Sequence, residues 1–283
     1  MEALTCAAVA WKVRYNPTLV GWLDHFDELL ELALNKGAGL VVFPECIDLE
    51  RLGPHDPVAL LGEAHEEWHS ALFDRATRNN LVIVGGSTLV STDHGLVNRS
   101  ITVWPDGQAT WADKHVLTQF EANEWGLATG TEFQSIRGVG TTVCYDSEFP
   151  ASSRALCEAG VWIQAVPAFT ETKHGFHRVR YACHARAMEN QVFVVHASLV
   201  GGLGYEPVPS TYGSAAVIAP PCGDFPADGV LAETEPGEEG VAVYWIDPEE
   251  LHRARLTGDT RNWDDRDKGQ WTVTVPTCRH PSE

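Results

Sequence analysis

Short runs of apolar and β-branched residues alternate along this chain with segments whose apolar residues recur at helical spacing. The first helical segment starts at Leu19, and its apolar positions lie three or four residues apart until Gly37, a residue suited to ending a helix. Strands that alternate with helices are typical of sheets covered by helices, and hairpin-like strands in the second half indicate mixed sheets. The chain is therefore predicted to adopt an α/β fold.

The predicted elements leave no convincing linker and show no internal repeat. Strands are expected over residues 3–9, 40–43, 81–84, 101–104, 162–166, 192–199, 214–218 and 241–246. Further helices are expected over residues 63–78, 150–159 and 177–190, and a turn at residues 105–107 returns the chain as a hairpin toward Lys114. A single domain over residues 1–283 is predicted, with a core of about residues 1–250 and a C-terminal extension over residues 251–283.

Composition excludes several classes of function. The formal net charge is −19, and such a surface repels nucleic acid and anionic membranes, so neither is an expected partner. No apolar stretch approaches the length of a membrane span, and the first residues lack a signal-peptide pattern. The seven cysteines are odd in number and have no close pairs, which favours a reducing compartment, the cytoplasm.

Cys144 follows the β-branched run of residues 141–143 and precedes a turn of small and polar residues that ends at Pro150, which can start a helix. A thiol at such a strand-to-helix turn points out of the sheet and lies near the positive end of a helix dipole. Both effects favour the thiolate, the nucleophilic form. A cysteine nucleophile also needs a base and a group that stabilises the developing oxyanion.

Two other predicted strands also end on a reactive side chain. Glu45 follows the strand over residues 40–43, and Lys114 stands at the end of the predicted hairpin. A charged residue after a strand is usually a solvated loop residue, so neither position is specific alone. The occurrence of Glu45, Lys114 and Cys144 in this order and with these flanks is much more specific.

With these motifs the chain resembles the nitrilase superfamily of carbon–nitrogen hydrolases. The resemblance extends over most of the chain, from the first strand to about residue 246. It rests on Phe43-Pro44-Glu45, on Lys114 with Leu117 and Phe120-Glu121, on Cys144-Tyr145-Asp146 with Phe149-Pro150, on Arg186-Ala187-Met188-Glu189-Asn190, and on Gly213-Ser214-Ala215.

The resemblance implies a four-layer α-β-β-α sandwich and a Glu-Lys-Cys triad. Cys144 is expected to attack an amide carbonyl and to form a thioester, with Glu45 as the general base. Lys114 and the backbone N–H of Tyr145 are expected to stabilise the oxyanion. The resemblance implies no metal and no cofactor.

The same resemblance implies a second glutamate that positions the lysine and the substrate. We expect this residue to be Glu121, while Glu124 and Glu132 stay open as alternatives. Family members usually pair through the helices that follow the cysteine. A homodimer or larger homo-oligomer through the helices over residues 150–159 and 177–190 is therefore expected.

The residues after the cysteine indicate the reaction. Nitrilases of the family usually have Trp-Glu there, whereas this chain has Tyr145-Asp146, as in the amidase and carbamoylase branches. We therefore expect hydrolysis of a small-molecule amide. Nitrile or N-carbamoyl hydrolysis by the same triad, acyl transfer to an amine, and a non-catalytic dimeric binding protein remain alternatives.

Glu148 departs from the pattern of many amidase-branch relatives, which have arginine at this position and in some cases bind a substrate carboxylate with it. One interpretation is that the substrate lacks a carboxylate at that end and is neutral or carries an amine. The other is that Glu148 faces solvent or caps the helix that begins at Pro150.

Two more residues are candidates for the wall of the substrate pocket. Trp125 follows Glu121 in a polar segment, where it either lines the pocket or anchors a loop. His174 is expected at the pocket because family loops in this region help to line it. The spacing of His174, His177 and His184 matches no metal motif, and a metal site is not expected.

Overall fold

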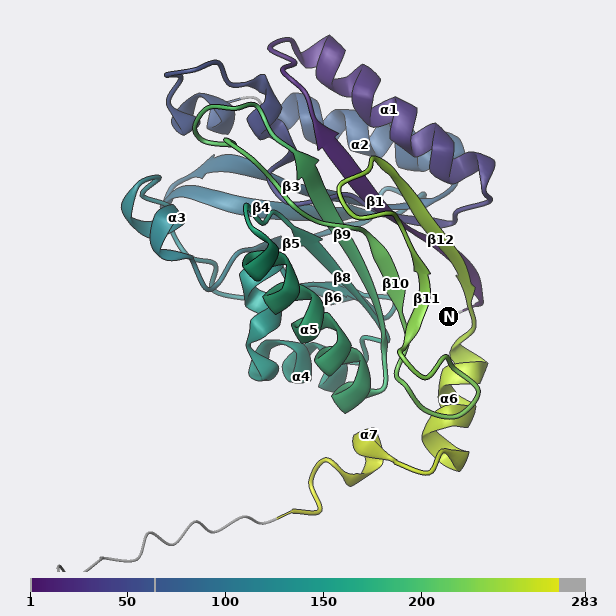
Figure 1. Cartoon of the computed structure of the whole chain (residues 1–283). Coiled ribbons are helices and arrows are strands. Elements are labelled where there is room, and N and C mark those ends of the chain that lie inside the picture. The colour runs from purple at the N-terminus through teal and green to yellow at the C-terminus, as the bar shows by residue number, and fades with distance from the viewer. Residues whose placement is uncertain (1, 64, 270–283) are drawn as a thin grey trace, which may run out of the picture.

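The computed structural model describes residues 2–63 and 65–269, and within these ranges a twelve-stranded mixed sheet is covered by helices (Figure 1). The strands are β1 Leu4–Val13, β2 Leu40–Val42, β3 Val82–Thr92, β4 Gly95–Val103, β5 Ala109–Asp113, β6 Ser135–Ile136, β7 Val139–Thr141, β8 Ile163–Ala168, β9 Phe193–Gly201, β10 Ala216–Ile218, β11 Val230–Glu233 and β12 Gly240–Ile246. The helices are α1 Leu19–Asn35, α2 His65–Asn79, α3 Gln119–Asn123, α4 Pro150–Glu158, α5 Lys173–Asn190, α6 Pro248–Thr257 and α7 Asn262–Asp265, with 3₁₀ turns η1 Ile47–Arg51, η2 Val58–Glu63 and η3 Cys144–Glu148.

Strand β1 joins the two halves of the sheet. It runs parallel to β2 and antiparallel to β12, and its last residues run parallel to β9. One half has the order β5-β4-β3-β2-β1, and the other has the order β9-β8-β7-β6 with β10 and β11 paired beyond β9. The sheet is therefore mixed, as the sequence predicts.

The side chains of β1 alternate between two cores, because successive residues of a strand point to opposite faces. Ala7, Val9 and Trp11 pack in a cluster with buried residues of α1 and α2. Cys6 and Ala8 pack in a second cluster, between the two halves of the sheet, with residues of β8 and β9. The two halves therefore stack face to face.

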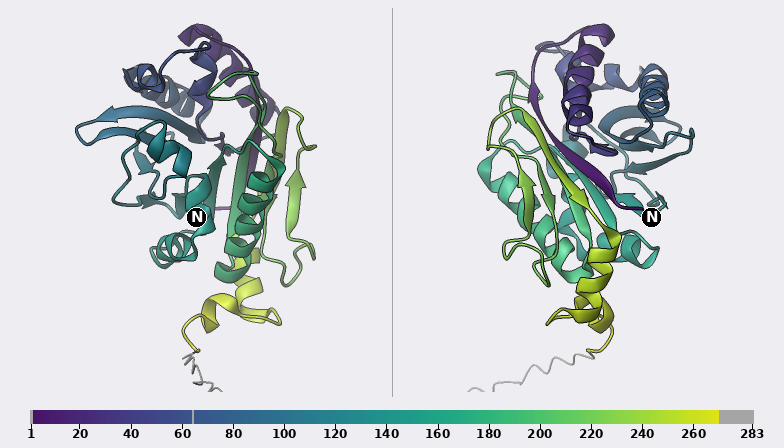
Figure 2. Two further views of the ribbon diagram at one scale, coloured as in Figure 1. Left: turned by 60° about the vertical axis from the view of Figure 1, so that its left-hand side comes forward. Right: turned by 90° about the vertical axis from the view of Figure 1, so that its right-hand side faces the viewer.

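A third cluster lies between the second half of the sheet and the helices α4 and α5, where Val166 and Val194 meet Cys157 and Cys183. The three cores separate four layers: α1 and α2, the first half of the sheet, the second half, and α4 and α5 (Figures 1 and 2). This is the α-β-β-α sandwich that the resemblance implies.

The predicted elements differ from the observed ones mainly at their ends. Helix α5 begins at Lys173, four residues before its predicted start, because the Thr172 side chain accepts a hydrogen bond from the N–H of Gly175 and caps it. Strand β3 continues to Thr92, eight residues beyond its prediction, where it pairs with β4. Gly37 ends α1 with φ +79°, as predicted.

A bulge in β3 holds the segment after β2. Gly86 has φ +69°, and a Cβ atom on it would lie 2.0 Å from the carbonyl oxygen of Pro44. The N–H of Ser87 donates to that carbonyl at 3.0 Å, and the Ser87 hydroxyl accepts from the N–H of Cys46, also at 3.0 Å. Both neighbours of Glu45 are thereby fixed to β3.

The part of the C-terminal extension that the structure describes continues past α6 to α7. The Arg255 guanidinium donates to the carbonyls of Asn190 and Gln191, where α5 ends. Residues 270–283 of the extension lie outside the described residues. Within residues 2–63 and 65–269, no helix combines the length and the apolar character that a membrane crossing needs.

Substitution of Gly86 by alanine tests the close approach of β3 to Pro44. Gly107 is the matched control, since it also has positive φ but has no atom within 4 Å of an added Cβ. Gly107→Ala is expected to cost ~1–2 kcal/mol of unfolding free energy, the penalty of the left-handed backbone alone. Gly86→Ala adds overpacking, for a total of roughly 2–5 kcal/mol. Urea unfolding measures both, and equal losses in the two variants would contradict the tight contact.

Candidate active site

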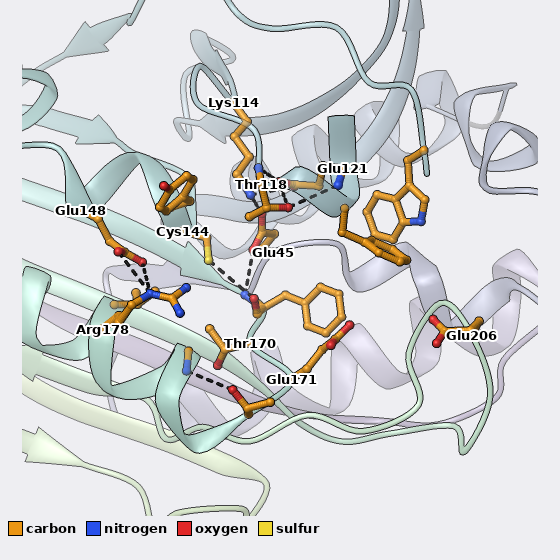
Figure 3. Close-up of a pocket in the computed structure, with 17 residues that line it drawn as sticks. Glu45, Lys114, Thr118, Glu121, Cys144, Glu148, Thr170, Glu171, Arg178 and Glu206 are labelled. Carbon is orange, nitrogen blue, oxygen red and sulfur yellow. Dashed lines mark hydrogen bonds and ion pairs between the residues drawn. The ribbon is translucent and has the colours of Figure 1, made fainter. Parts of the chain in front are cut away.

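Strand ends bring Glu45, Lys114 and Cys144 together although they are far apart in sequence. Glu45 stands three residues after β2, Lys114 directly follows β5, and Cys144 begins η3, three residues after β7. All three side chains are buried, with residue exposures of 2%, 2% and 5%. They line one cavity (Figure 3).

The Lys114 ammonium lies between two carboxylates. Its Nζ is 2.8 Å from Oε1 of Glu45 and 2.7 Å from Oε1 of Glu121. Asn98 Nδ2 donates to the same oxygen of Glu45 at 2.9 Å and to that of Glu121 at 3.3 Å. One ammonium and one amide thus hold the two carboxylates in a fixed relation.

The second carboxylate beside Lys114 belongs to Glu121, not to Glu124 or Glu132. The side chain of Thr118 and that of Glu121 form a reciprocal capping box at the start of α3, which fixes Glu121 Oε2. Glu124 ends α3 with an exposed side chain, and Glu132 is exposed and bonded to Gln134.

Burial and neighbouring charge set the protonation of this group. Burial by itself lowers the pKa of Lys114, but the charges of Glu45 and Glu121 outweigh it and raise that pKa well above its usual value. Lys114 is therefore charged. Burial raises the pKa of Glu45 above its usual value, although the ammonium of Lys114 acts in the opposite direction.

Cys144 is held in a backbone conformation that non-glycine residues seldom adopt, with φ +45°. Its Sγ lies 3.6 Å from the carbonyl oxygen of Phe169, and the N–H of Phe169 donates to Oε2 of Glu45 at 2.8 Å. Phe169 therefore connects the thiol with the carboxylate through one peptide unit on each side.

The surroundings of Cys144 favour the protonated thiol, in the opposite direction to the effect expected from its place at the turn. Burial, and then the negative charge of Glu45, raise the pKa of Cys144 well above its usual value, although Lys114 opposes them. The helix that could favour the anion, α4, begins only at Pro150, and a helix dipole acts within about one turn. A base is therefore required to make this sulfur nucleophilic.

Asp146 ties the turn that carries Cys144 to the turn that carries Lys114. Its Oδ1 accepts from the N–H of Val116 at 2.7 Å, and its two oxygens accept from the N–H of His115 at 3.2 and 3.1 Å. The side chain is buried, with 1% exposure. Asp146 thus fixes the relative position of the two turns.

The cavity beside Cys144 has a volume of about 310 Å³. Tyr145 and Trp125 line it, and the Trp125 ring also packs edge-on against Phe120 with ring centroids 5.5 Å apart, so the pocket wall and the loop contact considered for Trp125 both occur. The other lining residues are Glu45, Lys114, Thr118, Glu121, Cys144, Glu148, Phe169, Thr170, Glu171, Thr172, Gly175, Arg178, Val179 and Glu206.

Glu148 lies on the wall of this cavity, where its carboxylate accepts from Nε of Arg178 at 3.2 and 3.3 Å (Figure 3). The N-cap of α4 is Phe149, and no side chain caps that helix. The interpretation of Glu148 as a helix cap is therefore wrong. Its charge is balanced by an arginine from α5 that the sequence analysis did not anticipate.

His174 does not line the cavity, so the expectation for this residue is wrong. It lies in the first turn of α5 with an exposed side chain, while Gly175, Arg178 and Val179 of the same helix line the cavity. His174 and Arg178 are four residues apart and lie on one face of α5, but on that face the cavity lining includes Arg178 and not His174. Among residues 2–63 and 65–269, no three His, Cys, Asp or Glu side chains form a group that could hold a metal ion.

Three contributors to the site were missed in the sequence analysis: Asn98, Phe169 and Arg178. Asn98 is a polar residue at a buried position of β4, with 0% exposure. A polar residue at a buried strand position is unusual, so Asn98 could have been noticed if the predicted strand had extended to residue 98. Phe169 acts through its backbone, for which a sequence has no signal. Arg178 lies on a helix with two other arginines, Arg180 and Arg186, and nothing in the sequence distinguishes it from them.

Comparison with known proteins agrees with this geometry. The sequence pattern of the carbon-nitrogen hydrolase family matches residues 5–256. A probable hydrolase of Bacillus subtilis, YhcX, is 32% identical over 254 residues, which is 86% of this chain but about half the length of that protein. A deaminated glutathione amidase of Synechocystis is 27% identical over 88% of this chain and 94% of its own length.

The fold is also found in solved structures. A CN-hydrolase superfamily protein of Xanthomonas campestris superposes with a TM-score of 0.77 over 97% of this chain and 100% of its own, at 24% sequence identity. The agreement of sequence pattern, fold and buried residues leads to one assignment. The chain belongs to the carbon-nitrogen hydrolase family of enzymes.

Proposed function

We propose that this protein hydrolyses a small-molecule amide through a thioester on Cys144, with Glu45 as general acid and base and Lys114 as oxyanion stabiliser. The observation that carries the proposal is the buried Glu45–Lys114–Glu121 cluster that shares one cavity with a thiol of raised pKa. The amidase named among the sequence relatives supports an amide as substrate.

The acylation step follows from these positions. Glu45 takes the proton of Cys144 as the sulfur attacks the carbonyl carbon, and a tetrahedral oxyanion forms. The Lys114 ammonium, fixed by two carboxylates, stabilises that oxyanion without reorganising. Glu45 then gives its proton to the leaving nitrogen, the C–N bond breaks, and ammonia or an amine departs.

Hydrolysis of the thioester uses the same groups in reverse. Glu45 removes a proton from water, whose oxygen attacks the thioester carbon and forms a second oxyanion beside Lys114. The C–S bond breaks, the carboxylic acid is released, and the thiolate takes the proton from Glu45. Glu121 holds Lys114 in place throughout and takes part in no bond change.

We favour an amide over a nitrile because Tyr145-Asp146 follows the nucleophile, as in the amidase branch that the chain resembles, and because amidases are among its sequence relatives. In the structure Asp146 accepts hydrogen bonds from the backbone of His115 and Val116 and anchors the turn that carries Cys144. Hydrolysis of N-carbamoyl compounds would use the same steps on a closely related carbonyl group.

We also propose that the protein forms a homodimer through α4 and α5. Large apolar side chains are exposed on or beside these helices: Phe149 at 36%, Tyr181 at 67% and Met188 at 45%. Burial of such side chains is favourable and commonly occurs at a subunit interface.

Substitution of Cys144 tests the nucleophile. Cys144→Ala is expected to abolish ammonia release from a panel of small amides and to leave the thermal unfolding midpoint almost unchanged. The wild type is expected to act on the amides and not on the matching nitriles. Mass spectrometry with substrate should find an adduct on Cys144 alone, because Cys144 lines the cavity together with Glu45 and Lys114, whereas Cys157 and Cys183 are buried and do not line it. An adduct on either of these would overturn the assignment.

The acid limb of the pH profile tests Glu45. The proposed base works only when ionised, and burial raises its pKa above that of an ordinary glutamate, so kcat/KM is expected to begin to fall at a higher pH as the pH decreases. Glu45→Gln is expected to lower kcat by roughly 10²–10⁴-fold and to remove this limb. An unchanged limb in the variant would show that another group titrates.

Charge introduced at the exposed apolar face tests the dimer. Tyr181→Asp places a carboxylate in the proposed interface and is expected to shift the protein from dimer to monomer in sedimentation velocity. Leu32→Asp is the control, since Leu32 is 46% exposed on α1, in the layer on the other side of the molecule. A monomeric wild type, or a dimer that survives Tyr181→Asp but not Leu32→Asp, would contradict this interface.

A further inference from the structure

The charges on the cavity wall are unevenly distributed. At the end where Arg178 lies, its guanidinium and Glu148 balance one another. Glu171 and Glu206 also line the cavity, and neither forms an ion pair with any residue of the described ranges 2–63 and 65–269. In Figure 3 these two carboxylates lie on the side of the cavity away from the Glu148–Arg178 pair.

Glu171 is close to the proposed reaction centre. It lies two residues after Phe169, whose N–H donates to Glu45 and whose carbonyl lies 3.6 Å from the thiol. A two-residue step of extended chain spans at most about 7 Å. The backbone of Glu171 therefore lies close to the residue that contacts both Glu45 and Cys144, and its side chain lines the same cavity.

Glu206 connects this cavity to a second, larger one. The second cavity has a volume of about 780 Å³ and shares Phe120, Trp125 and Glu206 with the first. Its lining also includes Asp56 and Glu124 but contains no lysine and no arginine among the described residues. Lys114 and Arg178 are thus the lysine and arginine side chains of the first cavity, and the lining of the second, farther from Cys144, has acidic groups and aromatic rings but neither residue type among the described residues.

We propose that Glu171 and Glu206 bind a protonated amine at the end of the substrate remote from the scissile amide, so that the hydrolysed amide is a cation. This inference rests on the proposed function, because it names the substrate class of the same site. The rings of Phe120 and Trp125 complete the recognition, since an ammonium is attracted to an aromatic face and its methylene chain packs on it.

The behaviour of the two carboxylates supports this assignment. Burial, and then the negative charge of Glu206, raise the pKa of Glu171. The two groups therefore repel each other in the free protein, and a cation between them relieves that repulsion. The overall charge of −19 acts in the same direction, because it attracts a cationic substrate and repels an anionic one.

Three amides of equal chain length test the inference: 5-aminopentanamide, hexanamide and adipic acid monoamide carry an ammonium, a methyl group and a carboxylate at the far end. We expect kcat/KM for 5-aminopentanamide to exceed that for hexanamide by about tenfold, because a pair of exposed carboxylates contributes modestly. The preference should weaken at high salt.

The double variant Glu171→Gln/Glu206→Gln is expected to lose this tenfold preference while kcat/KM for hexanamide stays within about twofold. Glu238→Gln, an exposed glutamate outside both cavities, is the matched control and should keep the preference. Loss of activity on all three amides in the double variant would indicate a structural role and overturn the inference.

Calorimetric binding to Cys144→Ala separates recognition from turnover. We expect Cys144→Ala to bind 5-aminopentanamide more tightly than hexanamide, and we expect this difference to disappear when Glu171→Gln and Glu206→Gln are added. That result would support the inference even if the wild type hydrolysed no amide. In that case only the proposed function would fail. Equal binding of the two ligands would overturn the inference. If the wild type still hydrolysed amides, the proposed function would stand. Preference for adipic acid monoamide would also overturn it and would favour Arg178 as the recognition group.

Discussion

The ammonium of Lys114 is buried between the carboxylates of Glu45 and Glu121, and the rest of the site is arranged around this contact. A buried charge is costly unless it is paired and hydrogen-bonded, and here two carboxylates and the amide of Asn98 share that role. Removal of one partner would leave an uncompensated charge in the interior. The same arrangement keeps Lys114 protonated where an oxyanion would develop.

This contact also explains why the site needs three elements of the fold. The bulge of β3 fixes the backbone on both sides of Glu45, the capping box of α3 fixes Glu121, and Asp146 joins the turns of Lys114 and Cys144. Each device uses backbone hydrogen bonds. The side chains that would do chemistry are thereby placed by groups that take no part in it.

The buried carboxylates have opposite effects on their two neighbours. They raise the pKa of Lys114 and keep it charged, and the charge of Glu45, together with burial, keeps the Cys144 sulfur protonated. A resting thiol beside a carboxylate of raised pKa is suited to proton transfer at the moment of attack. Farther out, Glu148 is paired with Arg178, whereas Glu171 and Glu206 form no ion pair within the described part of the chain, so the cavity distinguishes its two ends by charge.

The sequence by itself determined the α/β class, most of the strands and helices, and the candidates Glu45, Lys114 and Cys144, because local patterns and short motifs carry that information. It favoured Glu121 as the second glutamate but left Glu124 and Glu132 open, since all three follow Lys114 in the same stretch of chain. Only the tertiary structure placed Glu121 on Lys114, set Arg178 against Glu148, left His174 out of the cavity lining and raised the pKa of Cys144. Burial and the approach of charges from distant segments decide these properties, and both exist only once the chain has folded.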